Sequence, residues 1–206
     1  MVRAREEEGV QKKKAFIGFY NIANFTTLLG ALFSLAGCLF AFKGEIWLAL
    51  ILLIVAGIID LFDGAVANRL KRSEESKAFG VQLDSLADVV SFGVAPIIIS
   101  FCNGANGIYA LIVYAFYLVT VIIRLAYFNS VTAQGDTSFF RGLPVTYVAL
   151  VMPIVFLIPV AMVHVAMFAV LALLFILNIR MPKPKGIWYA LFPLLAVGMI
   201  IVWCLK

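Results

Sequence analysis

Four aspartates stand at the ends of two long apolar segments, where charged side chains are unusual. These are Asp60, Asp63, Asp84 and Asp88. On insertion scales, a carboxylate at bilayer depth costs roughly 2.5 to 3.5 kcal/mol. Because four converging carboxylates would multiply that cost, their pattern implies that something positively charged binds between them.

The spacing places each set of carboxylates on one face of a helix. Asp60 and Asp63 are three residues apart, whereas Gly80, Asp84 and Asp88 recur at every fourth position. Residues at these intervals lie one above the other on a helix. Two carboxylates from each of two antiparallel helices would form an oxygen-rich site suited to Mg²⁺, Mn²⁺ or Ca²⁺.

Small residues continue the faces that carry the aspartates. These are Gly64, Ala67, Gly80 and Ala87. Small side chains let two helices approach closely or leave room for a flat ligand, and the sequence leaves both possibilities open. The alternative interpretation of the whole region is helix packing, with the acids solvated at the membrane surface.

The composition predicts an all-α, polytopic transmembrane helical bundle. The chain has 206 residues, of which 64% are hydrophobic, and its mean hydropathy is +1.07. A soluble domain is about 45–50% apolar. We expect a polar cytoplasmic tail at residues 1–14 and a single transmembrane domain at 15–206, because no linker divides the chain.

The apolar runs predict seven spans, with six or eight possible. The segment 144–179 is too long for one crossing of roughly 20 residues, so we expect two short helices there that turn near residues 160–164. The spans are expected at about 16–42, 46–68, 80–101 and 108–128, at two sites within 144–179, and at 187–205.

The basic residues predict the orientation of the bundle. If the N-terminus is inside, only Lys43 and Lys206 among the lysines and arginines lie outside. This asymmetry is what the positive-inside rule predicts, and it puts the aspartates at the cytoplasmic face.

The pattern D-x2-D-G-x2-A at 60–67, followed by G-x3-D-x3-D at 80–88, resembles the signature of the CDP-alcohol phosphotransferases. Within that family, the runs at 79–96, 123–129 and 142–146 resemble phosphatidylserine synthases. The resemblance covers about residues 20–150.

The resemblance implies an integral membrane enzyme, a CDP-diacylglycerol–serine O-phosphatidyltransferase. CDP-diacylglycerol and L-serine would be its substrates, and CMP and phosphatidylserine its products. Two Mg²⁺ or Mn²⁺ ions would be its cofactors, and a homodimer is expected. Nothing suggests nucleic-acid binding, because the basic residues are accounted for as membrane anchors.

The resemblance also assigns roles to residues. Asp60, Asp63 and Asp84 would be metal ligands, and Asp88 would be a metal ligand, the general base, or both. The residues expected to border the nucleotide are Asn24, Thr27, Gly64, Ala67, Asn68 and Gly80.

The chain departs from the family pattern after Ala67. Asn68 stands where the pattern has an arginine, Arg69 follows one position later, and eleven residues separate Asn68 from Gly80. A shift of one residue rotates a helical side chain by about 100°, so Arg69 would face elsewhere. The basic residues of the segment 71–77 are expected either to form a solvated connection or to take over phosphate contacts.

The carboxylate of serine needs a cationic partner, and Arg124 and Arg141 are the candidates. Arg124 could instead reach the membrane interface, and Arg141 could be an interfacial anchor. Asn129 and Thr146 are further candidates for serine contacts, with loop or helix-cap polarity as the alternative.

Three other functions fit parts of the pattern. A relative in the same family could use glycerol 3-phosphate, inositol phosphate or another small alcohol as acceptor. A non-enzymatic protein could use the carboxylates for cation binding or transport, although a transporter would place acids in several spans. A pseudoenzyme would explain the departure at Asn68.

Overall fold

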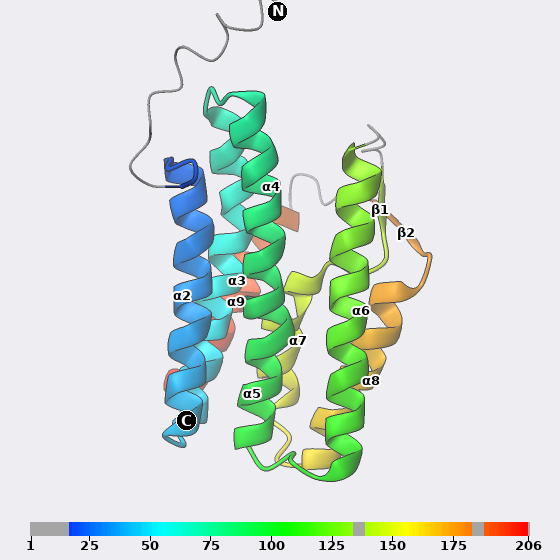
Figure 1. The fold of residues 1–206 in the computed structure, drawn as a ribbon. Helices are drawn as coiled ribbons and strands as arrows, with labels where there is room; N and C mark the ends of the chain where they lie inside the picture. The colour runs from blue at the N-terminus through cyan, green and yellow to red at the C-terminus, as the bar shows by residue number, and fades with distance from the viewer. Residues whose placement is uncertain (1–16, 134–138, 183–187, 206) are drawn as a thin grey trace, which may run out of the picture.

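A computed structural model describes residues 17–133, 139–182 and 188–205, and the predicted helical membrane bundle is confirmed (Figure 1). The tail at residues 1–14 lies outside the described residues. The long helices are α2 (Ile22–Phe42), α3 (Ile46–Arg69), α4 (Glu74–Asp88) continued by α5 (Ala95–Cys102), and α6 (Ile108–Ala133). The shorter helices are α7 (Val148–Val155), α8 (Ala161–Ile176) and α9 (Trp188–Cys204).

Four helical stretches in the described part of the chain are long and apolar enough to cross a membrane. They are Ile22–Phe42, Ile46–Gly64, Glu74–Cys102 and Ile108–Val131. Three shorter apolar helices follow, at Val145–Val155, Ala161–Ile176 and Pro193–Cys204. The seven predicted spans therefore correspond to four full-length helices and three shorter ones.

The first two helices pack closely as an antiparallel hairpin. Asn21 caps α2, because its side chain accepts a hydrogen bond from the Asn24 backbone N–H at 3.0 Å. Gly44 turns the chain into α3 with a φ of +82°, a conformation that favours glycine. A Cβ atom at Gly37 would lie 3.2 Å from the Ala49 carbonyl oxygen, so the small residue permits this close contact.

The helix that carries Asp84 and Asp88 begins at a capped N-terminus. The Ser73 side chain accepts a hydrogen bond from the Ser76 N–H, and Glu74 and Glu75 occupy the first turn. Acidic side chains there interact favourably with the positive end of the helix dipole. These local signals start α4 six residues before the first residue of the predicted span.

A π-helical segment, η2 (Val89–Val94), follows Asp88 directly and leads into α5. Pro96 has no N–H to donate to the Phe92 carbonyl in the α-helical register. The buried Tyr117 hydroxyl of α6 donates to that carbonyl at 2.5 Å instead. Membrane helices tolerate such interruptions only where a neighbour satisfies the freed backbone group, and Tyr117 does so here.

The second half of the bundle packs α6 against α8 (Figure 1). Phe168 of α8 meets the rings of Tyr114 and Tyr117 edge to face, with centroids 5.0 and 4.8 Å away. The chain turns at residues 156–160 and α8 begins at Ala161, so the turn predicted near 160–164 comes slightly earlier. The buried His164 lies inside α8.

A short antiparallel pairing of β1 (Phe139–Arg141) with β2 (Arg180–Pro182) joins the two loops beyond α6 and α8. The apolar pattern did not predict it, because three-residue strands leave no hydropathy signal. Gly142 follows β1 with a φ of +76°, and its N–H donates to the Ile179 carbonyl. A Cβ atom there would lie 2.5 Å from the Phe175 carbonyl oxygen, so glycine is required.

Candidate active site

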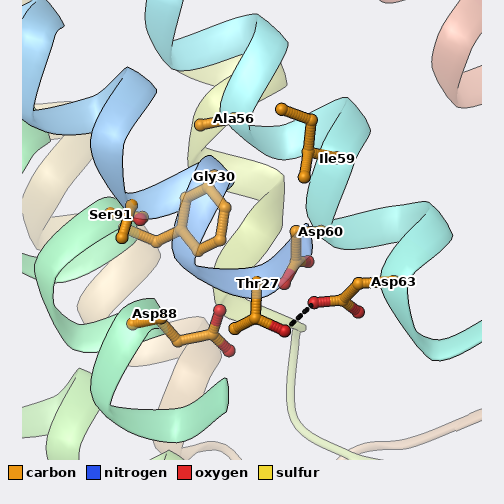
Figure 2. Close-up of a pocket in the computed structure, with 11 residues that line it drawn as sticks. Thr27, Gly30, Ala56, Ile59, Asp60, Asp63, Asp88 and Ser91 are labelled. Atoms are coloured by element: carbon orange, nitrogen blue, oxygen red, sulfur yellow. Dashed lines mark hydrogen bonds between the residues drawn. The ribbon is translucent and has the colours of Figure 1, made fainter. Parts of the chain in front are cut away.

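The predicted carboxylates converge between the antiparallel helices α3 and α4. Carboxylate oxygens of Asp60, Asp84 and Asp88 lie within 4.8 Å of one another. Asp63 lies beside this group, and only 9% of its surface is exposed. Figure 2 shows Asp60 and Asp63 on α3 facing Asp88 on α4.

Two threonine hydroxyls orient the carboxylates of α3. Thr27 of α2 donates a hydrogen bond to Asp63 Oδ2 at 2.9 Å (Figure 2). Thr146, in the short 3₁₀ turn η3 (Val145–Tyr147), donates to Asp60 Oδ2 at 2.7 Å. Partners of this kind fix the orientation of a metal-binding side chain. Thr146 was predicted to contact serine, but its hydroxyl contacts the acid cluster.

The donor set fits a divalent cation. A hollow of about 10 Å³, room for one water-sized occupant, is lined by Thr27, Asp60, Asp63 and Asp88. The ion pair found among the described residues joins Lys77 to Glu74, so it does not involve the carboxylates of this cluster. Carboxylate oxygens that converge without an ion-pair partner are the hard ligands that Mg²⁺, Mn²⁺ and Ca²⁺ prefer.

A second cavity, of about 180 Å³, adjoins the carboxylates on the side of the α3–α4 connection. Its lining includes five of the six residues predicted to border a nucleotide, together with Asp63, Asp84, Arg72 and Lys77. The five are Asn24, Thr27, Gly64, Ala67 and Gly80. A Cβ atom at Gly64 would meet nothing within 4 Å. This glycine therefore borders open space, and its small size is not needed for a close contact between helices.

The arginine at position 72 was missed as an individual site residue. The sequence predicted only that some basic residue of the α3–α4 connection could contact phosphate. Its departure from the family pattern at Asn68 was the available signal. The side chain of Asn68 lies outside the described part of the structure, and its backbone belongs to α3.

The candidates for serine contacts lie on the other side of the carboxylates. Arg124 is only 7% exposed, and its Nε donates to the Leu143 carbonyl at 3.2 Å. It also lies within electrostatic range of Asp88. Its side chain is therefore buried within the protein.

The remaining two candidates are less closely tied to the carboxylates. The Asn129 amide donates to the Ser85 hydroxyl at 2.8 Å, which joins α6 to α4 between Asp84 and Asp88. The backbone of Arg141 pairs with Arg180 in the β1–β2 ladder. Its side chain lies outside the described part of the chain.

The fold and site define a polytopic membrane protein in which a carboxylate cluster adjoins a polar cavity. The profile of the CDP-alcohol phosphatidyltransferase family matches residues 20–179, and the chain belongs to this family. The family typically uses divalent metals, and the cluster of Asp60, Asp84 and Asp88 could hold one.

The relatives that the chain resembles include serine-specific transferases. It is 34% identical over 147 residues to a CDP-diacylglycerol–serine O-phosphatidyltransferase of Saccharomyces cerevisiae, covering 64% of this chain and 52% of that protein. It is 32% identical over 137 residues to an archaetidylserine synthase of Methanothermobacter thermautotrophicus, covering 66% and 58%. A Helicobacter pylori CDP-diacylglycerol–serine O-phosphatidyltransferase is 29% identical over 179 residues, covering 82% and 74%. The chain thus spans little more than half the length of the first two relatives.

Proposed function

We propose that this protein transfers a phosphatidyl group from CDP-diacylglycerol to L-serine, giving phosphatidylserine and CMP. The observation that carries the proposal is the convergence of four carboxylates beside a polar cavity, in a chain of this family. The names of the relatives support serine as the acceptor.

The reaction exchanges one phosphorus–oxygen bond for another. The serine hydroxyl oxygen forms a bond to the phosphorus that carries the diacylglycerol. The bond from that phosphorus to the CMP oxygen breaks, and CMP leaves with the bonding electrons. Asp88 takes the hydroxyl proton, a role supported by its closeness to Asp84 and its electrostatic interaction with Arg124.

Asp60, Asp63, Asp84 and Asp88 would hold two Mg²⁺ or Mn²⁺ ions. Bound there, divalent metal would neutralise the diphosphate and stabilise the charge that develops on the leaving group. The hydrogen bonds from Thr27 and Thr146 support this assignment, because they leave the other oxygens of Asp63 and Asp60 available as ligands.

The cavity of about 180 Å³ would receive the nucleotide, with Asn24, Thr27, Gly64, Ala67 and Gly80 along it. Asn68 is proposed as a further nucleotide contact from the family resemblance alone. Arg124 would bind the serine carboxylate. The electrostatic interaction of Arg124 with Asp88 supports this role. Arg141 and Asn129 are proposed as further serine contacts, and Thr146 is proposed to act through Asp60.

We further propose that residues 15–206 form one domain whose active site faces the cytoplasm, with residues 1–14 as a cytoplasmic tail. Nucleotide substrates are found on that side of the membrane. A homodimer is proposed from the family resemblance.

The test is an assay of the purified full chain with CDP-diacylglycerol and either Mg²⁺ or Mn²⁺. CMP release is measured with serine, glycerol 3-phosphate and inositol phosphate in parallel. We expect release with serine, and none after chelation of the metal. CMP release only with another acceptor would mean that serine is not the substrate. If CMP release is independent of metal or absent with every acceptor, the proposed function is wrong.

Replacing a carboxylate tests the site within the same assay. Asp63→Ala and Asp84→Ala should each lower CMP release by more than about 100-fold, since a direct metal ligand matters more than its supporting partners. Glu75→Ala, which removes an exposed acid from the same helix as Asp84, is the matched control. Near-normal release by either aspartate variant, in protein that remains folded, would contradict the ligand assignment.

A further inference from the structure

The cavity beside the carboxylates contains a guanidinium group that the structure leaves without a full set of partners. Arg72 comes from the connection between α3 and α4 and lines the cavity of about 180 Å³. Its Nε atom is buried and has no hydrogen-bond partner. A buried donor without a partner is destabilising, so this arrangement is expected where a ligand completes it.

The head of Arg72 lies over Gly80, next to Asn24. A Cβ atom at Gly80 would lie 3.1 Å from Arg72 Nη1 and 3.2 Å from Asn24 Oδ1. The glycine therefore leaves the space that the guanidinium occupies. Asp84 lies one helical turn beyond Gly80 and lines the same cavity, so the guanidinium and the carboxylates border one space.

The other basic residues of the connection are placed differently. Lys77 also lines the cavity, but its ammonium group forms an ion pair with Glu74 at 2.7 Å. Arg69 and Lys71 are exposed, whereas Arg72 is half-buried. Of these four residues, Arg72 is the one whose charge faces the cavity without an acidic partner among the described residues.

We propose that Arg72 binds the diphosphate of the liponucleotide, in place of the arginine that the family pattern has where this chain has Asn68. This inference rests on the proposed function, because it assigns a contact within that nucleotide site. The longer connection between Ala67 and Gly80 supplies the basic group from a loop, whereas the pattern supplies it from a helix. A guanidinium suits this role because its donors match two phosphate oxygens at once.

The geometry also explains why a loop residue can act there. Arg72 directly precedes Ser73, the N-cap of α4, so its backbone is held by the start of that helix. Carboxylate-bound metal would neutralise the diphosphate from the side of Asp63 and Asp84, and Arg72 would contact it from the side of Gly80. The diphosphate would lie between these two positively charged groups.

The experiment measures CDP binding to the detergent-purified full chain by calorimetric titration in the presence of Mg²⁺. Arg72→Ala and Arg72→Gln are compared with the wild type, and Lys71→Ala is the control, since it removes the exposed neighbouring charge. We expect both Arg72 variants to bind CDP about 10- to 100-fold more weakly, as for loss of a charge-assisted hydrogen bond. Lys71→Ala should bind CDP as the wild type does.

Two further measurements separate binding from folding. The unfolding temperatures of the Arg72 variants without ligand should equal that of the wild type within a few degrees. The KM for CDP-diacylglycerol should rise, while the KM for serine stays within about twofold. Gly80→Ala, whose Cβ would displace the Arg72 head, should also weaken CDP binding.

The outcomes distinguish this inference from the proposed function. If the wild type binds CDP and both Arg72 variants bind it equally well, the assignment of Arg72 is wrong while the function stands. If Lys71→Ala weakens binding as much as Arg72→Ala, a general electrostatic effect replaces the specific contact. If the wild type binds CDP but transfers nothing to serine, the proposed acceptor fails and the Arg72 assignment is still tested by the titration.

Discussion

At the scale of single residues, the carboxylates depend on hydroxyl groups contributed from elsewhere in the chain. Thr27 lies 36 residues from Asp63 in the sequence, and Thr146 lies 86 residues from Asp60. Each threonine occupies one oxygen of its aspartate. The aspartates are therefore oriented by α2 and by the turn η3, and the metal-binding geometry depends on both.

Thr146→Val should raise the metal concentration that gives half-maximal CMP release by about 10- to 100-fold. Valine keeps the shape of threonine but cannot donate to Asp60, and loss of a supporting partner has an effect of this size on metal affinity. The measurement is a titration of activity with Mg²⁺.

The control is Thr120→Val, which removes another buried hydroxyl. That hydroxyl donates to the Tyr117 carbonyl within its own helix and not to an aspartate. A metal requirement that is unchanged by Thr146→Val would mean that Asp60 needs no such support. An equal change in both variants would point to a general loss of packing.

Much of the site could be predicted at this scale, because the four aspartates recur at helical spacing. The contacts of Thr146 and Arg72 could not be predicted in the same way. Both come from connections whose path depends on tertiary packing, and neither has a periodic relation to the residues it contacts. Arg124 could be predicted in part. Its position on the same side of the membrane as the aspartates was predicted, but its hydrogen bond to the Leu143 carbonyl was not.

At the scale of helices, the position of Asp88 depends on the change from α-helix to π-helix that follows it. The wider π-helical turn shifts the register of α5 relative to α4. Apolar periodicity could not predict this segment, because Val89–Val94 contains a single polar residue, Ser91, and so has no two-sided pattern. Pro96 was the local signal, and the hydrogen bond from Tyr117 to Phe92 is the long-range contact that stabilises it.

Tyr117→Phe should lower the free energy of unfolding by about 1–3 kcal/mol. The substitution keeps the ring contacts with Phe168 but leaves the buried Phe92 carbonyl without its donor. Thermal unfolding in detergent measures the change. Tyr109→Phe, which removes a hydroxyl from a ring that is 45% exposed, should have little effect. Equal unfolding temperatures for Tyr117→Phe and the wild type would show that the π-helical segment does not need this bond.

At the scale of the whole molecule, the bundle places the α3–α4 connection, which borders the nucleotide cavity, at one end. The starts of α2 and α4 and the end of α6 lie at that end, together with β1 and β2 (Figure 1). The turns after α2, α5 and α7 lie at the other end. An exposed stripe of Leu28, Leu32, Leu35 and Leu39 runs along α2 between the two ends. Hydropathy was sufficient to predict this arrangement, because each long helix must satisfy its own backbone in the membrane.

The excess of basic residues near one end predicts which face is inside the cell, and accessibility to a membrane-impermeant maleimide tests it. Cys102→Ser and Cys204→Ser remove the two cysteines that are not buried, and a single cysteine is then placed at Lys43 or Lys71. We expect Lys43→Cys to react in intact cells, because it lies in the turn between α2 and α3. Lys71→Cys, in the connection beside the active site, should react only after the membrane is permeabilised. The reverse pattern would place the carboxylates on the outer face, where a cytoplasmic nucleotide substrate could not reach them.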